Sequence, residues 1–272
     1  MDFKHKNMKQ ILIFVLFFSF GFSQKVIVKF KFKINNDFLS TSKNFTLKQD
    51  DNASIFEIDD EKDEKQVNDY KQISFKSYLE KDSISIFSIG DYGITSIWKE
   101  KNFKNFKENF QIHNYKNFKT ILYVKDSLEV IKWNLIEKSD TIIAYYNCKK
   151  ATAKFRGRDY LAYYTSEIAN QGGPYKFDGL PGFIVKVKSI DGYLDISPTE
   201  ISVPKIKTNN IYNPFKGKEL ILFRELKDKI IEDERKMFEK FKLDKDIKLP
   251  SLVRGPFKGI EDVGLNYTRE YK

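Results

Sequence analysis

Residues Gly172 to Val185 read GGPYKFDGLPGFIV, in a chain that is otherwise rich in lysine and poor in glycine. Glycine permits positive φ, whereas proline fixes φ and removes a hydrogen-bond donor. Placed together, these residues fix a backbone path instead of loosening it. The run therefore predicts a rigid turn of unusual shape, whose structural positions are Gly173, Pro174, Gly179, Pro181 and Gly182.

The end of this run predicts its own local structure. Pro181 and Gly182 occupy the second and third positions of Leu180–Phe183, which is the preferred chemistry of a type II turn. Apolar residues then alternate with lysine through Lys188, so the turn leads into a half-buried strand. Two interpretations remain open for the loop. It is either a rigid corner of the fold, or a shaped loop that holds Tyr175, Phe177 and Leu180 against a ligand or partner.

Period-two alternation extends along most of the chain. In Val26–Ile34, five apolar side chains share one face and three lysines occupy the other, as in a strand with one wet face. Short strands of this kind with little helix between them indicate a meandering sheet or an open barrel. The other predicted strands are Phe45–Lys48, Ser54–Ile58, Ile73–Leu79, Ile84–Ile89, Ile94–Trp98, Thr120–Val124, Leu128–Trp133, Thr141–Tyr146, Ala151–Phe155, Tyr160–Thr165, Phe183–Lys188 and Tyr193–Ile196.

One segment, Gly217–Leu243, carries a helical pattern instead. Its apolar stripe predicts an amphipathic helix that packs on the sheet or binds a partner. The stripe consists of Phe223, Leu226, Ile230, Met237 and Phe241. The predicted fold is therefore α+β and β-dominated: a curved antiparallel sheet, like an open half-barrel, with one long C-terminal helix. We expect a single domain over residues 24–249 and a C-terminal tail over 250–272.

The block from about Trp133 to Ile190 resembles the GLPGLI family, exported proteins of Bacteroidetes-type bacteria. Phe183 replaces the usual leucine of the hexapeptide, and Tyr163 stands where tryptophan is common. The resemblance implies an exported β-rich protein and carries over no catalytic residue. The matching motifs are Trp133-Asn134-Leu135, Tyr146-Asn147-Cys148-Lys149-Lys150-Ala151, Phe155-Arg156-Gly157-Arg158-Asp159-Tyr160, Tyr163-Tyr164-Thr165-Ser166-Glu167-Ile168, Gly173-Pro174-Tyr175-Lys176-Phe177 and Gly179-Leu180-Pro181-Gly182-Phe183-Ile184.

The N-terminus has the pattern of a secretory signal peptide over residues 1–23. A lysine-rich start precedes the apolar run Ile11–Phe20, and Gly21-Phe22-Ser23 places small residues at the two positions that determine cleavage. We expect cleavage between Ser23 and Gln24 and export to the periplasm, the cell surface or the medium. An uncleaved anchor is the alternative.

The amino-acid composition narrows the classes of partner that the protein could bind. The net charge is +10, but lysine alternates with apolar residues along strands, which is typical of solvated sheet faces and not of a nucleic-acid site. Peripheral contact with an anionic membrane fits this charge. Cys148 is the only cysteine, so no internal disulfide can form, and its apolar neighbours predict a buried side chain.

Catalytic signals are few. His113 is the only histidine after the signal peptide, and neither a nucleophile elbow nor a phosphate-binding glycine loop is present, so the sequence predicts no metal and no cofactor. Glu167 and Asp178 flank the glycine-proline run and leave open a hydrolase that uses two carboxylates. That reading rests only on their nearness in the sequence.

A second candidate cluster lies just before the run. Ala151–Phe155 and Tyr160–Thr165 predict a hairpin about Gly157, which would place Arg156 and Arg158 at its tip. Arginine there could bind a carboxylate or phosphate of a ligand, or could pair with a carboxylate of the chain and lock the turn. Tyr160 and Tyr164 share one strand face, and Tyr residues on an exposed face would supply flat binding area.

Three functions fit these observations. The preferred one is non-enzymatic binding of an apolar or amphipathic ligand, or of an envelope partner, through the sheet face and the Gly173–Phe183 loop. This function predicts a deep apolar cavity. A structural or accessory module of an envelope transport complex predicts instead a filled core with an exposed apolar patch. A hydrolase predicts that Glu167 and Asp178 converge in a cleft.

Overall fold

A computed structural model describes residues 25–35, 40–59, 79–80, 83–84, 101–117, 120–204, 210–244, 252–253 and 268–269. The predicted signal peptide, the predicted strand Ile94–Trp98, nearly all of Ile73–Leu79 and Ile84–Ile89, and most of the predicted tail lie outside the described residues.

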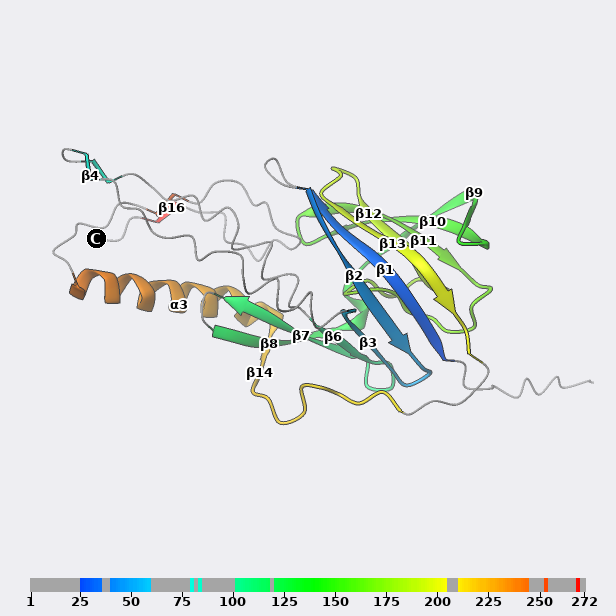
Figure 1. The fold of residues 1–272 in the computed structure, drawn as a ribbon, viewed down its shortest axis with the longest axis horizontal. Helices are drawn as coiled ribbons and strands as arrows, with labels where there is room; N and C mark the ends of the chain where they lie inside the picture. The colour runs from blue at the N-terminus through cyan, green and yellow to red at the C-terminus, as the bar shows by residue number, and fades with distance from the viewer. Residues whose placement is uncertain are drawn as a thin grey trace, which may run out of the picture.

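Within the described residues, twelve strands form one sheet in the order β14-β8-β7-β6-β3-β2-β1-β13-β12-β11-β10-β9 (Figure 1). Neighbouring strands are antiparallel except β14 and β8, which run parallel. The two end strands do not pair with each other, so the sheet is open. This confirms a β-dominated, mostly antiparallel fold. The strands are β1 (Val26–Asn35), β2 (Ser40–Gln49), β3 (Ala53–Ile58), β6 (Asn102–Asn105), β7 (Phe110–Asn117), β8 (Thr120–Ser127), β9 (Asn134–Ile143), β10 (Tyr146–Phe155), β11 (Arg158–Thr165), β12 (Phe183–Ser189), β13 (Leu194–Ser202) and β14 (Leu220–Leu222).

Strand β1 lies in the middle of this order and shows why the sheet forms. Every second residue from Val26 to Ile34 is apolar and buried, whereas the other face carries the half-buried Ile27 and the exposed Lys29, Lys31 and Lys33. Each buried side chain of this size stabilises the folded state by about 1.5–3 kcal/mol. The predicted alternation is therefore confirmed residue by residue.

Some predicted strands have different bounds or do not form. Leu128–Trp133 was expected as a strand, but Leu128–Val130 is a 3-10 turn, capped by the Ser127 side chain. Thr141–Tyr146 is divided by a tight turn at Ala144 and Tyr145, where β9 reverses into β10. Two further short pairs are β4 (Leu79–Glu80) with β5 (Ser83–Ile84) and β15 (Leu252–Val253) with β16 (Thr268–Arg269).

The C-terminal helix α3 spans Phe223–Asp244 and lies beside β8 at one end of the sheet (Figure 1). It begins later than predicted because Leu220–Leu222 pairs with β8 as β14. Leu226 and Ile230 are buried against Val124 of β8, which confirms for these two residues that the stripe packs on the sheet. Within the described part of the chain, no helix is both long and apolar enough to span a bilayer.

The connection between β11 and β12, residues 166–182, is here called the Gly-Pro loop. Its end is not the predicted type II turn: Gly182 donates its N–H to the Leu180 carbonyl at 2.8 Å, which closes a tighter three-residue turn around Pro181. Gly182 also lies against the backbone of Thr165. A Cβ at position 182 would meet the Thr165 carbonyl oxygen at 2.4 Å. Only glycine allows this approach.

Gly182→Ala should therefore destabilise the fold by about 3 kcal/mol or more, because backbone atoms on both sides would have to move apart. Gly192→Ala is the matched control, since Gly192 also has a positive φ, 76°, but a Cβ there meets nothing within 4 Å. The control should lose about 1–2 kcal/mol. Urea unfolding of both variants measures the difference, and equal losses would contradict the close approach.

Candidate functional site

Lys104 holds the Gly-Pro loop to the sheet. Its side chain extends from β6 and is fully buried. The ammonium group donates to the carbonyl oxygens of Gly173 (3.0 Å) and Phe177 (2.6 Å) and to Oδ2 of Asp178 (2.9 Å). An ammonium has three donors, and all three find an acceptor within the loop. The contact therefore neutralises a buried charge and satisfies two buried carbonyl groups at once.

Asp178 is held from several sides. Its second oxygen, Oδ1, accepts the N–H of Gly179 at 2.8 Å, and its backbone carbonyl accepts Nε1–H of Trp133 at 2.7 Å. Burial lowers the pKa of Lys104 from its ordinary value, and the nearby Asp178 carboxylate opposes that shift. Lys104 and Asp178 thus form a desolvated ion pair. Both of its charges face groups of this chain, so the pair holds the loop in place.

Tyr175 lies in the left-handed region at φ 53°, which is costly for a bulky residue. Its ring is buried and makes an edge contact with Phe32 of β1, with 5.5 Å between ring centroids. Phe177 makes a similar contact with Tyr160 of β11 at 4.9 Å. Rings from β1 and β11 thus hold the loop from two parts of the sheet.

Five of the predicted binding side chains belong to the main hydrophobic core. Exposures range from 1% to 6%, so these side chains pack within the core. Ligand binding at these positions stays a prediction. The five are Tyr160, Tyr164, Tyr175, Phe177 and Leu180.

The arginines lie at a hairpin turn, as predicted, because Phe155 pairs with Arg158 across Arg156 and Gly157. Arg156 forms an ion pair with Asp126, and its guanidinium stacks 3.1 Å from the ring centre of Phe223. The structure therefore agrees with the interpretation that these arginines lock the turn.

Arg158 is paired in the same way at the other side of that turn. It forms an ion pair with Asp191 and lies 4.1 Å from the ring centre of Tyr193. Both arginines thus pair with carboxylates of the chain itself, and neither presents its guanidinium as a ready-made site for a foreign anion.

The two candidate catalytic carboxylates have separate surroundings. Glu167 is exposed, and its Oε1 accepts from the backbone N–H (3.2 Å) and the side-chain amide (2.6 Å) of Asn147. Asp178 is buried against Lys104 and lines a pocket to which Glu167 does not contribute. The arrangement therefore offers no paired acid and base across a common cleft.

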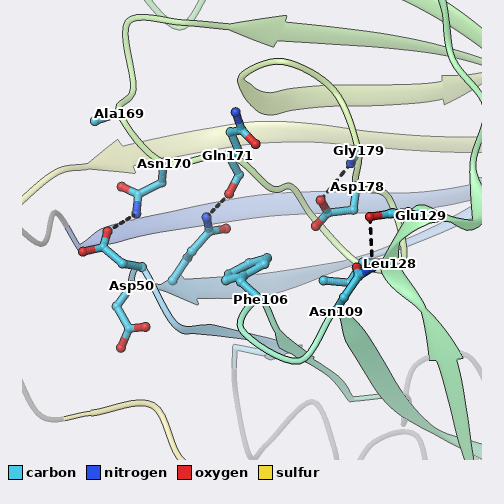
Figure 2. A pocket seen from close by; sticks show the side chains of 12 residues that line it. Asp50, Phe106, Asn109, Leu128, Glu129, Ala169, Asn170, Gln171, Asp178 and Gly179 are labelled. Carbon is cyan, nitrogen blue, oxygen red and sulfur yellow. Dashed lines mark hydrogen bonds between the residues drawn. The ribbon is translucent and has the colours of Figure 1, made fainter.

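That pocket lies beside the Gly-Pro loop and has a volume of about 430 Å³ (Figure 2). It is formed where the β2–β3 turn, the β6–β7 turn and the start of the 3-10 turn meet the loop. Most of its lining groups are amides and carboxylates, so it is not the deep apolar cavity expected for an apolar ligand. The lining residues are Gln49, Asp50, Asp51, Phe106, Asn109, Leu128, Glu129, Ala169, Asn170, Gln171, Asp178 and Gly179.

Two further residues with side chains able to take part in catalysis are buried. His113 is fully buried on β7, and Cys148 is a buried free thiol, as its neighbours predicted. Burial raises the pKa of Cys148 to about 11, which keeps it protonated at neutral pH. Over the described ranges, no three His, Cys, Asp or Glu side chains lie together as a set able to hold a metal ion.

No family model and no curated protein matches the chain. Among solved structures, two of PNGF-II, in space groups C2 and P21, are similar, with TM-scores of 0.47 and 0.46 and sequence identities of 15% and 14%. Each match covers 74% of this chain and 31% of the PNGF-II chain, so the chain spans about a third of that protein.

A domain assigned as an outer membrane lipoprotein-sorting protein, from Vibrio parahaemolyticus, matches with a TM-score of 0.26 and 8% identity. That match covers 66% of this chain and 85% of the other. All three TM-scores are below 0.5, so these likenesses establish neither a shared fold nor a shared activity.

Sequence reasoning missed Lys104, the residue on which the loop depends. In the sequence it stands among Asn102, Phe103 and Asn105, and it resembles the many lysines that face solvent on other strands. The available signal was that polar residues at 102 and 104 alternate with Phe103, which marks a strand with one polar face. That this polar face is buried, as Phe103 on the other face is, is visible only in the structure.

Lys104→Met should destabilise the protein by about 3–5 kcal/mol, because Asp178 and two loop carbonyls lose their partner while staying buried. Lys48→Met is the matched control, since Lys48 forms an exposed ion pair with Glu57. It should cost less than about 1 kcal/mol. Urea unfolding gives both values, and a loss in Lys104→Met as small as the control's would show that the loop does not depend on this contact.

Cys148 should be nearly inert in the folded protein. A rise in pKa from 9.0 to about 11 lowers the thiolate population at pH 8 by about 100-fold, and burial slows access further. Its reaction rate with a colorimetric disulfide reagent should fall at least that far below the rate in concentrated urea. Comparable rates in the two conditions would contradict the buried position.

Proposed function

We propose that the chain is an exported GLPGLI-family protein of the cell envelope, which binds a partner protein and performs no catalysis. The signature run and the signal-peptide pattern of residues 1–23 support the family and the export. The geometry of the Gly-Pro loop supports a structural role for the signature residues, since Gly182, Asp178 and Tyr175 all fix the path of the loop.

The observation that carries this proposal is the filled core. Residues of β1, β2, β3 and β10 to β13 join the Gly-Pro loop in one hydrophobic cluster. We infer that the sheet curves as an open half-barrel around the loop, which occupies the concave side where an apolar ligand would have to lie. A filled core is what distinguishes an interaction module from a carrier with an apolar cavity.

An apolar surface suited to a partner lies on the β9–β10 hairpin. Tyr145 at the turn is 99% exposed, and Ile142 beside it is 71% exposed. Leu135, on the same strand β9, is 54% exposed. Among the described strands, β9 is the last of the sheet and pairs only with β10. Aromatic and aliphatic side chains at a protruding tip are typical anchors of protein interfaces.

The proposal is tested by photo-crosslinking in the host. Tyr145→p-benzoylphenylalanine should yield, in the envelope fraction, one adduct of defined mass, because this side chain would lie inside the interface. The same replacement at Lys154 is the matched control, since Lys154 is exposed on β10 of the same hairpin but outside the apolar tip.

Two results would contradict the proposal. One is an unprocessed chain in the cytoplasmic fraction, which would remove export. The other is an absence of any adduct specific to position 145 over position 154, which would remove the hairpin as the docking surface. Ile142→Ser should weaken a specific adduct while leaving the melting temperature within a few degrees, because this side chain lies beside the turn and is largely exposed.

A further inference from the structure

The end of the β9–β10 hairpin extends beyond the next strand of the sheet. β10 pairs with β11 from Lys149 onward, whereas among the described strands residues 146–148 pair with β9 alone. Residues 141–148, here called the hairpin tip, therefore form a two-stranded ladder. A two-stranded hairpin on its own is at best marginally stable in water, so the tip needs support from another part of the chain.

The base of the hairpin tip is a β-bulge. After Cys148, which pairs with Thr141, the register shifts. The next pair joins Lys150 to Ile136, so several residues of β9 lie opposite one residue of β10. Lys138, inside this bulge, has a positive φ of 49°. A bulge interrupts the ladder of hydrogen bonds and bends the strand. Pairing in the body of the sheet therefore does not fix the direction of the tip.

The turn of the hairpin tip is strained. Ala144 and Tyr145 have φ values of 47° and 71°, in the left-handed region that asparagine and glycine usually occupy in such turns. A side chain as bulky as tyrosine is disfavoured there. Because Tyr145 is 99% exposed, packing within the described chain does not offset this cost. Strain at an exposed aromatic residue fits a role in contacts outside the molecule.

Glu167 supplies support to the hairpin tip. Its Oε1 accepts both the backbone N–H of Asn147, at 3.2 Å, and the side-chain amide of Asn147, at 2.6 Å. The backbone N–H is the donor that a third strand would otherwise bond, so the carboxylate replaces a strand at this point. Asn147 pairs with Ile142 and lies two residues after Tyr145. The contact therefore acts directly on the two most exposed side chains of the proposed interface.

Glu167 is itself held in place by its neighbours in the Gly-Pro loop. Its backbone N–H donates to the hydroxyl of Thr165 at 3.1 Å, and Thr165 is buried at the end of β11. On the other side, Ile168 belongs to the main hydrophobic core. The carboxylate thus projects from a fixed point of the loop, and through it the loop orients the tip.

We propose that Glu167 is a positioning residue of the docking hairpin. Its carboxylate holds the hairpin tip in the orientation in which Tyr145 and Ile142 meet the partner protein. This inference rests on the proposed function and adds to it a role for the Gly-Pro loop. The loop not only fills the core but also sets the direction of the binding surface.

The reactivity of Cys148 tests whether Glu167 holds the hairpin tip. This thiol is buried within the ladder of the tip, so its rate of reaction with a colorimetric disulfide reagent reports opening of the tip. Burial chiefly raises the pKa of Cys148, and the Glu167 carboxylate adds to that rise. Loss of the charge alone therefore speeds the reaction slightly, and the test needs a variant that separates the two effects.

Glu167→Gln removes the charge and keeps an accepting oxygen, whereas Glu167→Ala removes both. We expect a rate within about threefold of the unchanged chain for Glu167→Gln and at least about tenfold faster for Glu167→Ala. The urea midpoint should stay nearly constant in both, because Glu167 is exposed and the opening is local. Equal rates in the two variants would overturn the proposal.

Photo-crosslinking from position 145 tests the effect on the partner. Glu167→Ala should lower the yield of the specific adduct at least about fivefold, and Glu167→Gln should restore most of it. Glu200→Ala is the matched control, since Glu200 is an exposed carboxylate on β13 that pairs with Lys29. An undiminished yield in Glu167→Ala would overturn the positioning role. If even the unchanged chain forms no adduct, the docking function itself fails, while the thiol rates still show whether Glu167 holds the tip.

Discussion

The buried ammonium of Lys104 is the contact on which the rest of the structure depends. A loop that packs into a hydrophobic core buries carbonyl groups that no neighbouring strand can satisfy. Lys104 supplies donors to two such carbonyls and meets its counter-charge on Asp178. With that contact in place, Tyr175 can keep a costly positive φ and pack on Phe32. Without it the loop would carry unpaired polar groups into the core.

The Gly-Pro loop and the sheet share one hydrophobic core. The aromatic residues that would line a ligand cavity pack in the core instead. The nearby Arg156 and Arg158 form ion pairs with Asp126 and Asp191. Within the described part of the chain, the exposed apolar tip of the β9–β10 hairpin is a feature that internal contacts do not explain.

The alternation of apolar and polar residues predicted local structure well wherever one face of a strand is exposed to solvent. Val26–Ile34 and the hairpin about Gly157 follow from alternation and turn chemistry alone. The pattern failed where polar residues are buried. Because Asn102, Lys104 and His113 are buried in β6 and β7, the sequences of these two segments did not predict strands. It also placed Leu128–Trp133 in a strand, because an apolar run does not reveal that the Ser127 side chain caps a turn.

The sequence by itself determined that a rigid glycine-proline corner interrupts a β-rich chain and that one amphipathic helix follows near the C-terminus. These are local properties, set by φ restrictions and by the spacing of apolar side chains. Only the tertiary structure decided what the corner contacts. The partners of the loop come from Lys104 and Gln49, far away in the sequence, and nothing in a local pattern distinguishes these two from the lysines and glutamines that face water. Burial, and not residue type, gives them their roles.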